Sequence, residues 1–65
     1  MKVSEMCGED LLALKRKYVY EENAKKGRDT GWLELEAAES LVTDEEVRLR
    51  YEGVDLEEAD LDEYR

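Results

Sequence analysis

Apolar and polar residues alternate in two stretches of the chain, 32–36 (Trp-Leu-Glu-Leu-Glu) and 46–52 (Glu-Val-Arg-Leu-Arg-Tyr-Glu). Alternation with a period of two is typical of a strand that buries one face. In the first stretch the two leucines would face the core and the two glutamates would face solvent. A third candidate strand lies at 15–22, where Tyr-Val-Tyr consists of residues that favour strands. The pattern therefore predicts a sheet of three short strands.

The second stretch also carries helical signals. Thr43-Asp-Glu-Glu fits a capping box, in which Thr43 would begin a helix, and Gly53 stands where that helix would end. On a helix, Val47 and Tyr51 would share one face and Leu49 would point away from it. Because seven residues alternate without interruption, we favour the strand.

Two helices are expected nearer the ends of the chain. The first spans 4–15 and uses leucines for its apolar face. Leu11, Leu14 and Tyr18 also fall at helical spacing, so this helix could instead continue through the Tyr-Val-Tyr segment. The second spans 55–64, where Asp-Leu-Glu-Glu repeats the capping pattern and the outer face would be acidic.

These elements predict an α+β domain, in which an N-terminal helix and a short C-terminal helix pack on a three-stranded antiparallel sheet. The whole chain, 1–65, is expected to form one domain because a chain this short supports a single core. That core would contain Leu11, Leu14, Tyr18, Leu33, Leu35, Val47, Leu49, Tyr51 and Leu61, with Trp32 at its edge. The alternative is an all-α three-helix bundle with helices near 9–26, 44–52 and 56–64.

Charge is distributed unevenly along the chain. The protein has nineteen acidic and ten basic side chains and no histidine, which gives a net charge of −9. Thirteen of the carboxylates lie from residue 33 onward, where only three arginines oppose them, so this half carries −10 and the first half +1. A surface of this sign repels nucleic acid and anionic lipid and attracts basic proteins. We therefore expect a basic protein as partner, with no direct binding to nucleic acid or membrane.

Catalysis, a cofactor and a metal site are not expected. The chain has no histidine to act as a base, and its serines and threonines stand in no nucleophile pattern. A calcium loop counted from Asp55 would need glycine at its sixth position, which is Asp60. Cys7 could be a reactive thiol at the start of a helix, but we favour a semi-buried structural residue. A lone thiol, with no signal-peptide pattern and no long apolar run, predicts a cytoplasmic protein.

The acidic half supplies the candidate partner-binding residues. Carboxylates on one strand face would repeat about every 6.6–6.8 Å, and carboxylates one turn apart on a helix lie about 5–6 Å apart. Such rows could occupy a Lys/Arg groove that is built to bind phosphates. A plainer interpretation is that these carboxylates only keep the protein soluble. The residues expected to contact a partner are Glu34, Glu36, Glu45, Glu46, Asp55, Glu57, Glu58, Asp60, Asp62 and Glu63.

In its length, its net charge of −9 and the concentration of carboxylates between Asp44 and Glu63, the chain resembles the small acidic inhibitors that phages use against host defence. Anti-CRISPR and anti-restriction proteins belong to that class. The resemblance implies a non-enzymatic inhibitor, monomeric or homodimeric, that mimics DNA and binds a basic nucleic-acid-recognition surface. A CRISPR surveillance complex in the host cytoplasm is one candidate partner.

A second functional hypothesis needs no DNA mimicry. The chain would then be a small protein–protein interaction module, such as an antitoxin or an accessory subunit. It would dock through apolar groups, either a strand edge or the aromatic residues Trp32 and Tyr64.

Overall fold

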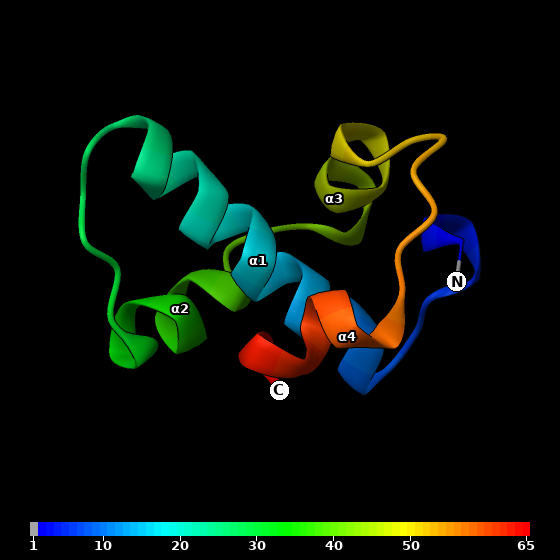
Figure 1. The fold of residues 1–65 in the computed structure, drawn as a ribbon, viewed down its shortest axis with the longest axis horizontal. Coiled ribbons are helices and arrows are strands. Elements are labelled where there is room, and N and C mark those ends of the chain that lie inside the picture. The colour runs from blue at the N-terminus through cyan, green and yellow to red at the C-terminus, as the bar shows by residue number, and fades with distance from the viewer. Residues whose placement is uncertain (1) are drawn as a thin grey trace.

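The computed structural model describes residues 2–65, and within this range the regular structure is helical. Helix α1 crosses the middle of the molecule, with α3 on one side of it and α2 and the C-terminal turn on the other (Figure 1). Residues 2–65 contain no sheet, and their one β-type pairing is an isolated antiparallel bridge between Lys2 and Asp55. The elements in chain order are η1 (Val3–Glu5), α1 (Glu9–Lys25), α2 (Trp32–Glu39), α3 (Asp44–Arg50), α4 (Glu58–Leu61) and η2 (Asp62–Tyr64).

The predicted α+β fold with a three-stranded antiparallel sheet is therefore wrong. The all-α alternative is much nearer, because its three ranges overlap α1, α3 and the α4–η2 segment. It lacked one element, since 32–39 is also helical. The protein is a small all-helical fold.

Helix α1 replaces both the helix expected at 4–15 and the strand expected at 15–22. Its seventeen residues contain neither glycine nor proline, so nothing interrupts the backbone hydrogen bonds. Glu9 and Asp10 lie in its first turn and Lys25 in its last, which suits the helix dipole. The preference of Tyr-Val-Tyr for a strand is overridden because Tyr18 and Val19 pack against the core from a helix.

Helix α2 occupies the first predicted strand, 32–36. Its leucines, glutamates and alanines are good helix formers, so local propensity favours the helix over the short alternation. Leu35 is buried, as expected, but Leu33 is 83% exposed. The prediction that Leu33 belongs to the core is wrong. Residues two positions apart on a helix lie on nearly opposite faces, so Leu33 points outward when Leu35 points inward. Trp32, expected at the core edge, is about half exposed at 49%.

Helix α3 occupies the other contested stretch, so the strand expected at 46–52 is wrong. The Thr43 hydroxyl oxygen accepts a hydrogen bond from the backbone N–H of Glu46 at 3.2 Å, as the capping pattern indicated. Val47 and Tyr51 are buried, whereas Leu49 is 72% exposed and lies outside the core. The local cap and the four-residue spacing of the two buried side chains therefore outweigh the alternation.

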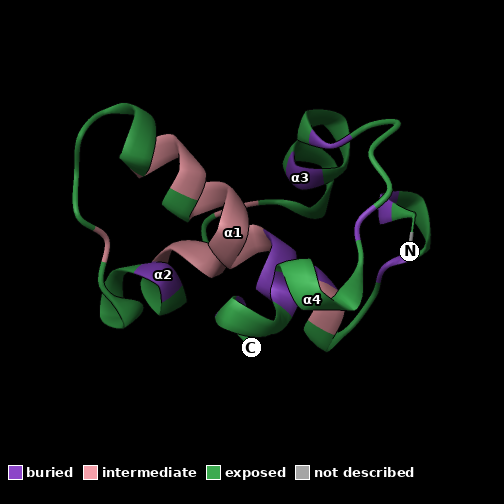
Figure 2. Cartoon of the chain, in the orientation of Figure 1, coloured by how far each residue is buried: buried purple, intermediate pink, exposed green. Residues whose placement is uncertain are grey.

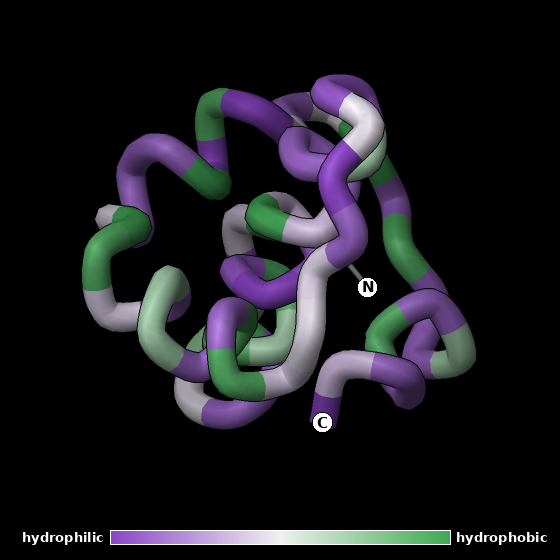
Figure 3. The backbone as a smooth tube through the Cα atoms, turned by 90° about the vertical axis from the view of Figure 1, so that its left-hand side faces the viewer, coloured by the Kyte–Doolittle hydropathy of each residue, from purple (hydrophilic) through white to green (hydrophobic). Residues whose placement is uncertain are grey.

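The core forms where the first half of α1 meets α3, α4 and the segments at both ends of the chain (Figure 2). Leu11, Leu14, Leu35, Val47, Tyr51 and Leu61 are buried as predicted, and Tyr18 is half-buried against them. Hydrophobic residues occur singly or in short runs between hydrophilic ones along the backbone (Figure 3), so the core draws on many segments. Its buried members that were not predicted are Val3, Met6, Ala13, Leu56 and Tyr64.

A pair of substitutions in α3 distinguishes the helix from the strand. We expect Val47→Ala to lower the free energy of unfolding by roughly 2 kcal/mol, because a fully buried side chain loses packing. We expect Leu49→Ala to change it by less than about 0.5 kcal/mol, because this side chain is mostly in solvent. Urea unfolding followed by circular dichroism measures both values. Equal losses for the two variants would contradict the helix and support the alternating strand.

Candidate functional site

The ten carboxylates predicted to contact a partner are all exposed, and they lie on three parts of the fold. Two are on α2, two are in the first turn of α3, and the rest lie between the end of α3 and the end of η2. In that order they are Glu34 and Glu36, then Glu45 and Glu46, then Asp55, Glu57, Glu58, Asp60, Asp62 and Glu63.

Arg16 of α1 joins α2 to the C-terminal turn. Its guanidinium forms an ion pair with Glu39 of α2 and donates a hydrogen bond from Nη1 to the backbone carbonyl of Tyr64 at 2.9 Å. The same guanidinium lies 5.7 Å from the centre of the Trp32 ring, within cation–π range. These contacts place α2 and the C-terminal turn on the same side of α1, as Figure 1 shows.

The C-terminal acidic segment is anchored at both ends. Leu56, Leu61 and Tyr64 are buried in the core. The Arg65 guanidinium lies 2.7 Å from an Asp10 carboxylate oxygen and 3.8 Å from one of Asp62. The carboxylates between these anchors are therefore held on an ordered support rather than on a loose tail.

Individual carboxylates of this segment differ in what they do. The backbone N–H of Glu57 donates to the Asp60 carboxylate at 3.0 Å, so these two residues form the start of α4. Asp62 is the partner of Arg65. Glu58 and Glu63 are exposed and form no ion pair or side-chain hydrogen bond within residues 2–65. They are the carboxylates whose replacement should disturb the fold least.

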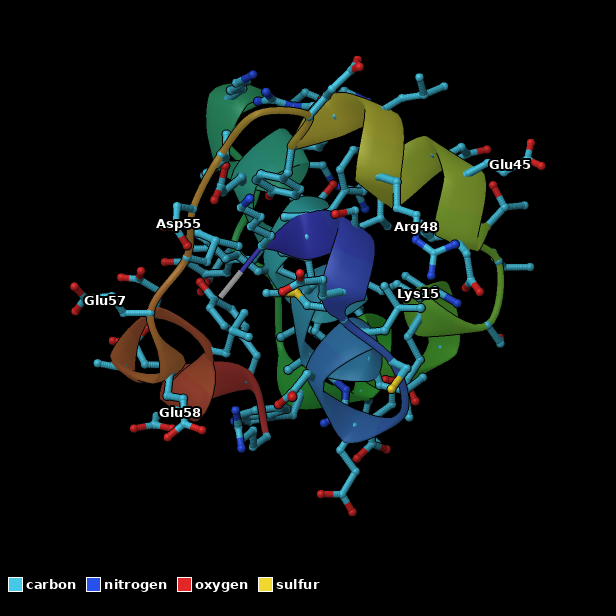
Figure 4. The ribbon with its side chains drawn as sticks, turned by 90° about the vertical axis from the view of Figure 1, so that its right-hand side faces the viewer. Lys15, Glu45, Arg48, Asp55, Glu57 and Glu58 are labelled. Atoms are coloured by element: carbon cyan, nitrogen blue, oxygen red, sulfur yellow. The ribbon has the colours of Figure 1, made fainter. Side chains whose placement is uncertain are left out.

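The carboxylates of α3 lie elsewhere. Seen from the right-hand side of Figure 1, Glu45 lies at one edge of the molecule and Glu57 and Glu58 at the opposite edge, with Lys15 and Arg48 between them (Figure 4). Glu45 of α3 therefore lies apart from Glu57 and Glu58 of the C-terminal segment. We use the term acidic side for the exposed carboxylates of α2 and of the segment 57–63, the two parts of the chain that flank the Arg16 contacts. They are Glu34, Glu36, Glu57, Glu58, Asp60, Asp62 and Glu63.

Two groups with shifted pKa values, Tyr51 and Asp44, owe the shift to packing and to an ion pair. Burial raises the pKa of the Tyr51 hydroxyl well above its usual range, and the nearby negative charge of Glu21 acts in the same direction. A hydrogen bond from Lys15 lowers the pKa of Asp44, whose carboxylate lies 2.6 Å from the Lys15 Nζ.

Residues 2–65 contain no group of three or more side chains placed to hold a metal ion. The longest helix in that range has seventeen residues and is rich in charged side chains, so no described helix meets the requirements of a membrane span. Cys7 is exposed, so the interpretation of this residue as semi-buried is wrong.

Sequence reasoning missed the role of Arg16 and the exposure of several leucines. Leu33, Leu41 and Leu49 are 83%, 80% and 72% exposed. The strand assignment placed two of them inside, so their availability to a partner was hidden. The run Lys15-Arg16-Lys17 could have indicated the role of Arg16. Consecutive residues on a helix point in different directions, so adjacent basic side chains can pair with acidic residues on different neighbouring helices.

No protein-family model matches the chain, and no curated protein or solved structure is significantly similar to it.

Loss of Arg16 should loosen the attachment of both α2 and the C-terminal turn. We expect Arg16→Ala to lower the free energy of unfolding by roughly 1–3 kcal/mol, because the half-buried Glu39 and the Tyr64 carbonyl each lose a charged donor. Arg28→Ala is the matched control, since the Arg28 side chain is exposed and forms no ion pair or side-chain hydrogen bond within residues 2–65. Urea unfolding of the two variants tests this role, and an equal effect of both would contradict it.

The pair between Lys15 and Asp44 should make stability depend on acid pH. Because the folded pKa of Asp44 is lowered, its contribution is present above the unfolded pKa, near 3.8, and is lost as the pH falls through the folded value. We expect Asp44→Asn to be less stable than the parent protein at pH 7, and the difference to shrink progressively as the pH falls below 3.8. Urea unfolding at a series of pH values measures the gap, and a gap that stays constant across the series would exclude this linkage.

Proposed function

We propose that this protein is a non-enzymatic inhibitor that binds, through its acidic side, to a basic nucleic-acid-recognition surface of a partner protein. The observation that supports the proposal is the fixed placement of exposed carboxylates on α2 and on the C-terminal segment. Arg16 ties both elements to α1, and buried Leu35, Leu61 and Tyr64 hold them on the core. The partner class that fits is a nucleic-acid-dependent defence complex, as for anti-CRISPR or anti-restriction proteins.

The charge composition of the two elements favours a cationic partner. Neither 32–39 nor 57–64 contains a basic residue, while the two segments together contain eight carboxylates. Of these, Glu39 is paired with Arg16 and Asp62 with Arg65. Glu57 and Asp60 form the capping hydrogen bonds of α4. The carboxylates that remain available are Glu34, Glu36, Glu58 and Glu63. Fixed charges of one sign speed the encounter with an oppositely charged groove and make the complex sensitive to salt. A Lys/Arg groove that follows DNA phosphates has the required sign.

Competition with duplex DNA tests the proposal. Labelled DNA would be bound to purified CRISPR surveillance complexes and restriction enzymes, and its displacement by this protein would be followed by fluorescence anisotropy. We expect displacement from at least one complex, weakening steeply as salt rises. The double variant Glu58→Lys and Glu63→Lys should displace DNA at least tenfold less well.

The control for this experiment carries the same net charge. Glu5→Lys with Asp29→Lys also reverses two exposed carboxylates, neither of which belongs to the acidic side. If the control loses as much activity as the Glu58 and Glu63 variant, net charge rather than the acidic side is responsible. Displacement from no complex in the panel, or binding that is indifferent to salt, would reject the proposal.

The second candidate function is an interaction module, such as an antitoxin or an accessory subunit, that docks through apolar side chains. The exposure of Leu33 and Leu41 favours it, at 83% and 80%. The docking routes first considered need correction, because residues 2–65 contain no strand edge and Tyr64 is buried. For this function, Leu33→Ser with Leu41→Ser should abolish binding to the partner, and the charge reversals should leave it unchanged.

A further inference from the structure

A groove of about 700 Å³ lies between η1, the end of α3 and the segment 51–55. Two of its lining side chains, Val3 and Tyr51, are buried in the core. Two others, Leu49 and Val54, are 72% and 41% exposed. The volume is in the range of sites that hold a small ligand or a few side chains. The groove therefore offers an apolar wall to solvent at a place that contributes nothing to the acidic side.

Two of the three carboxylates that line the groove, Glu45 and Glu52, lie close to Leu49 in the sequence. Glu45, Leu49 and Glu52 are separated by four and three residues, so they follow one another along the same face of α3 and the turn after it. Both glutamates line the groove and are exposed. Neither has an ion pair within residues 2–65. Their negative charge is therefore available to an incoming cation.

Two basic residues, Lys2 and Arg48, also line the groove. The Nη2 atom of Arg48 lies 3.4 Å from the Met6 carbonyl, to which it donates. Figure 4 shows the Arg48 side chain turned from α3 toward the Lys15 side of the view, away from Asp55. The backbone of Lys2 forms the antiparallel bridge with Asp55. Three carboxylates and two basic residues thus line the groove, so its apolar wall has a border with a small excess of negative charge.

We propose that this groove binds a segment of a partner protein in which a Lys or Arg stands next to an aliphatic or aromatic residue. The apolar side chain packs against Leu49 and Val54, and the cation lies near Glu45 or Glu52. A second copy of this chain is a poor occupant, because each copy brings a net charge of −9 and the same two unpaired glutamates. This docking surface is separate from the acidic side and does not depend on the function proposed above.

Nuclear magnetic resonance with defined peptides tests the groove. The isotope-labelled protein would be titrated to millimolar concentration with acetyl-Lys-Leu-Trp-Lys-amide. The control peptides carry Glu in place of both Lys, or Gly in place of Leu and Trp. We expect the first peptide to shift backbone resonances within 2–4 and 45–55, and both controls to bind at least tenfold more weakly.

Variants of the groove separate specific docking from charge attraction. Leu49→Ser should weaken the first peptide at least tenfold without unfolding the protein, because Leu49 is mostly in solvent. Glu45→Gln with Glu52→Gln should weaken it several-fold, and Glu58→Lys with Glu63→Lys should leave the groove shifts unchanged.

Three outcomes would overturn the inference. The first is an absence of shifts in the groove at millimolar peptide. The second is a set of shifts centred on 57–63, which indicates attraction by charge alone. The third is a dimer, seen by sedimentation, that Leu49→Ser dissociates, which would assign the groove to a second copy. A loss of DNA displacement by the Glu58 and Glu63 variant bears only on the acidic side.

Discussion

Burial of one face of α1 is the interaction on which the other elements depend. Leu14 is fully buried, Ala13 is 1% exposed, and α1 contacts α2, α3, α4 and η2. A chain of this length buries only about 60% of the surface that its unfolded form exposes, so it has no material for a second core. The elements that carry charge at the surface are therefore arranged by what they bury against this one helix.

The basic run in α1 links this packing to the charge of the surface. Lys15 pairs with Asp44 of α3, and the next residue, Arg16, pairs with Glu39 of α2. Adjacent positions on a helix point about 100° apart, so neighbouring cations can reach elements on different sides of α1. Lys15 and Arg16 thus form ion pairs between helices. Within the described part of the chain, most carboxylates on α2 and in the C-terminal segment have no basic partner.

The helical identity of α3 could be inferred from the sequence, but the alternation of Val47, Leu49 and Tyr51 also fits a strand. Val47 and Tyr51 are four residues apart and both are buried, as expected for one face of a helix. Leu49 lies between them in the sequence but is exposed, so the apolar residues alternate although only two of the three face the core. The Thr43 cap was the better guide, because a hydrogen bond between neighbouring residues needs no tertiary context. Within α2 only Leu35 is buried, so the order of apolar and polar residues in this segment does not distinguish a helix from a strand.

The exposure of the carboxylates followed from their chemistry, but their grouping did not. Whether Glu34 lies on the same side of α1 as Glu63 depends on contacts between distant residues, above all those of Arg16 with α2 and with the Tyr64 carbonyl. The same holds for the groove beside Leu49, which exists only because η1 and the segment 51–55 meet. Single-sequence patterns describe one element at a time and do not encode such contacts.

The position of Trp32 has a practical consequence. It is the one tryptophan in the chain, it is half exposed, and its ring lies under the Arg16 guanidinium where α1, α2 and the C-terminal turn converge. Indole emission responds to the polarity and charge around the ring. The intrinsic tryptophan fluorescence of the protein is therefore sensitive to changes in the packing of α1, α2 and the C-terminal turn, without a dye or an introduced label.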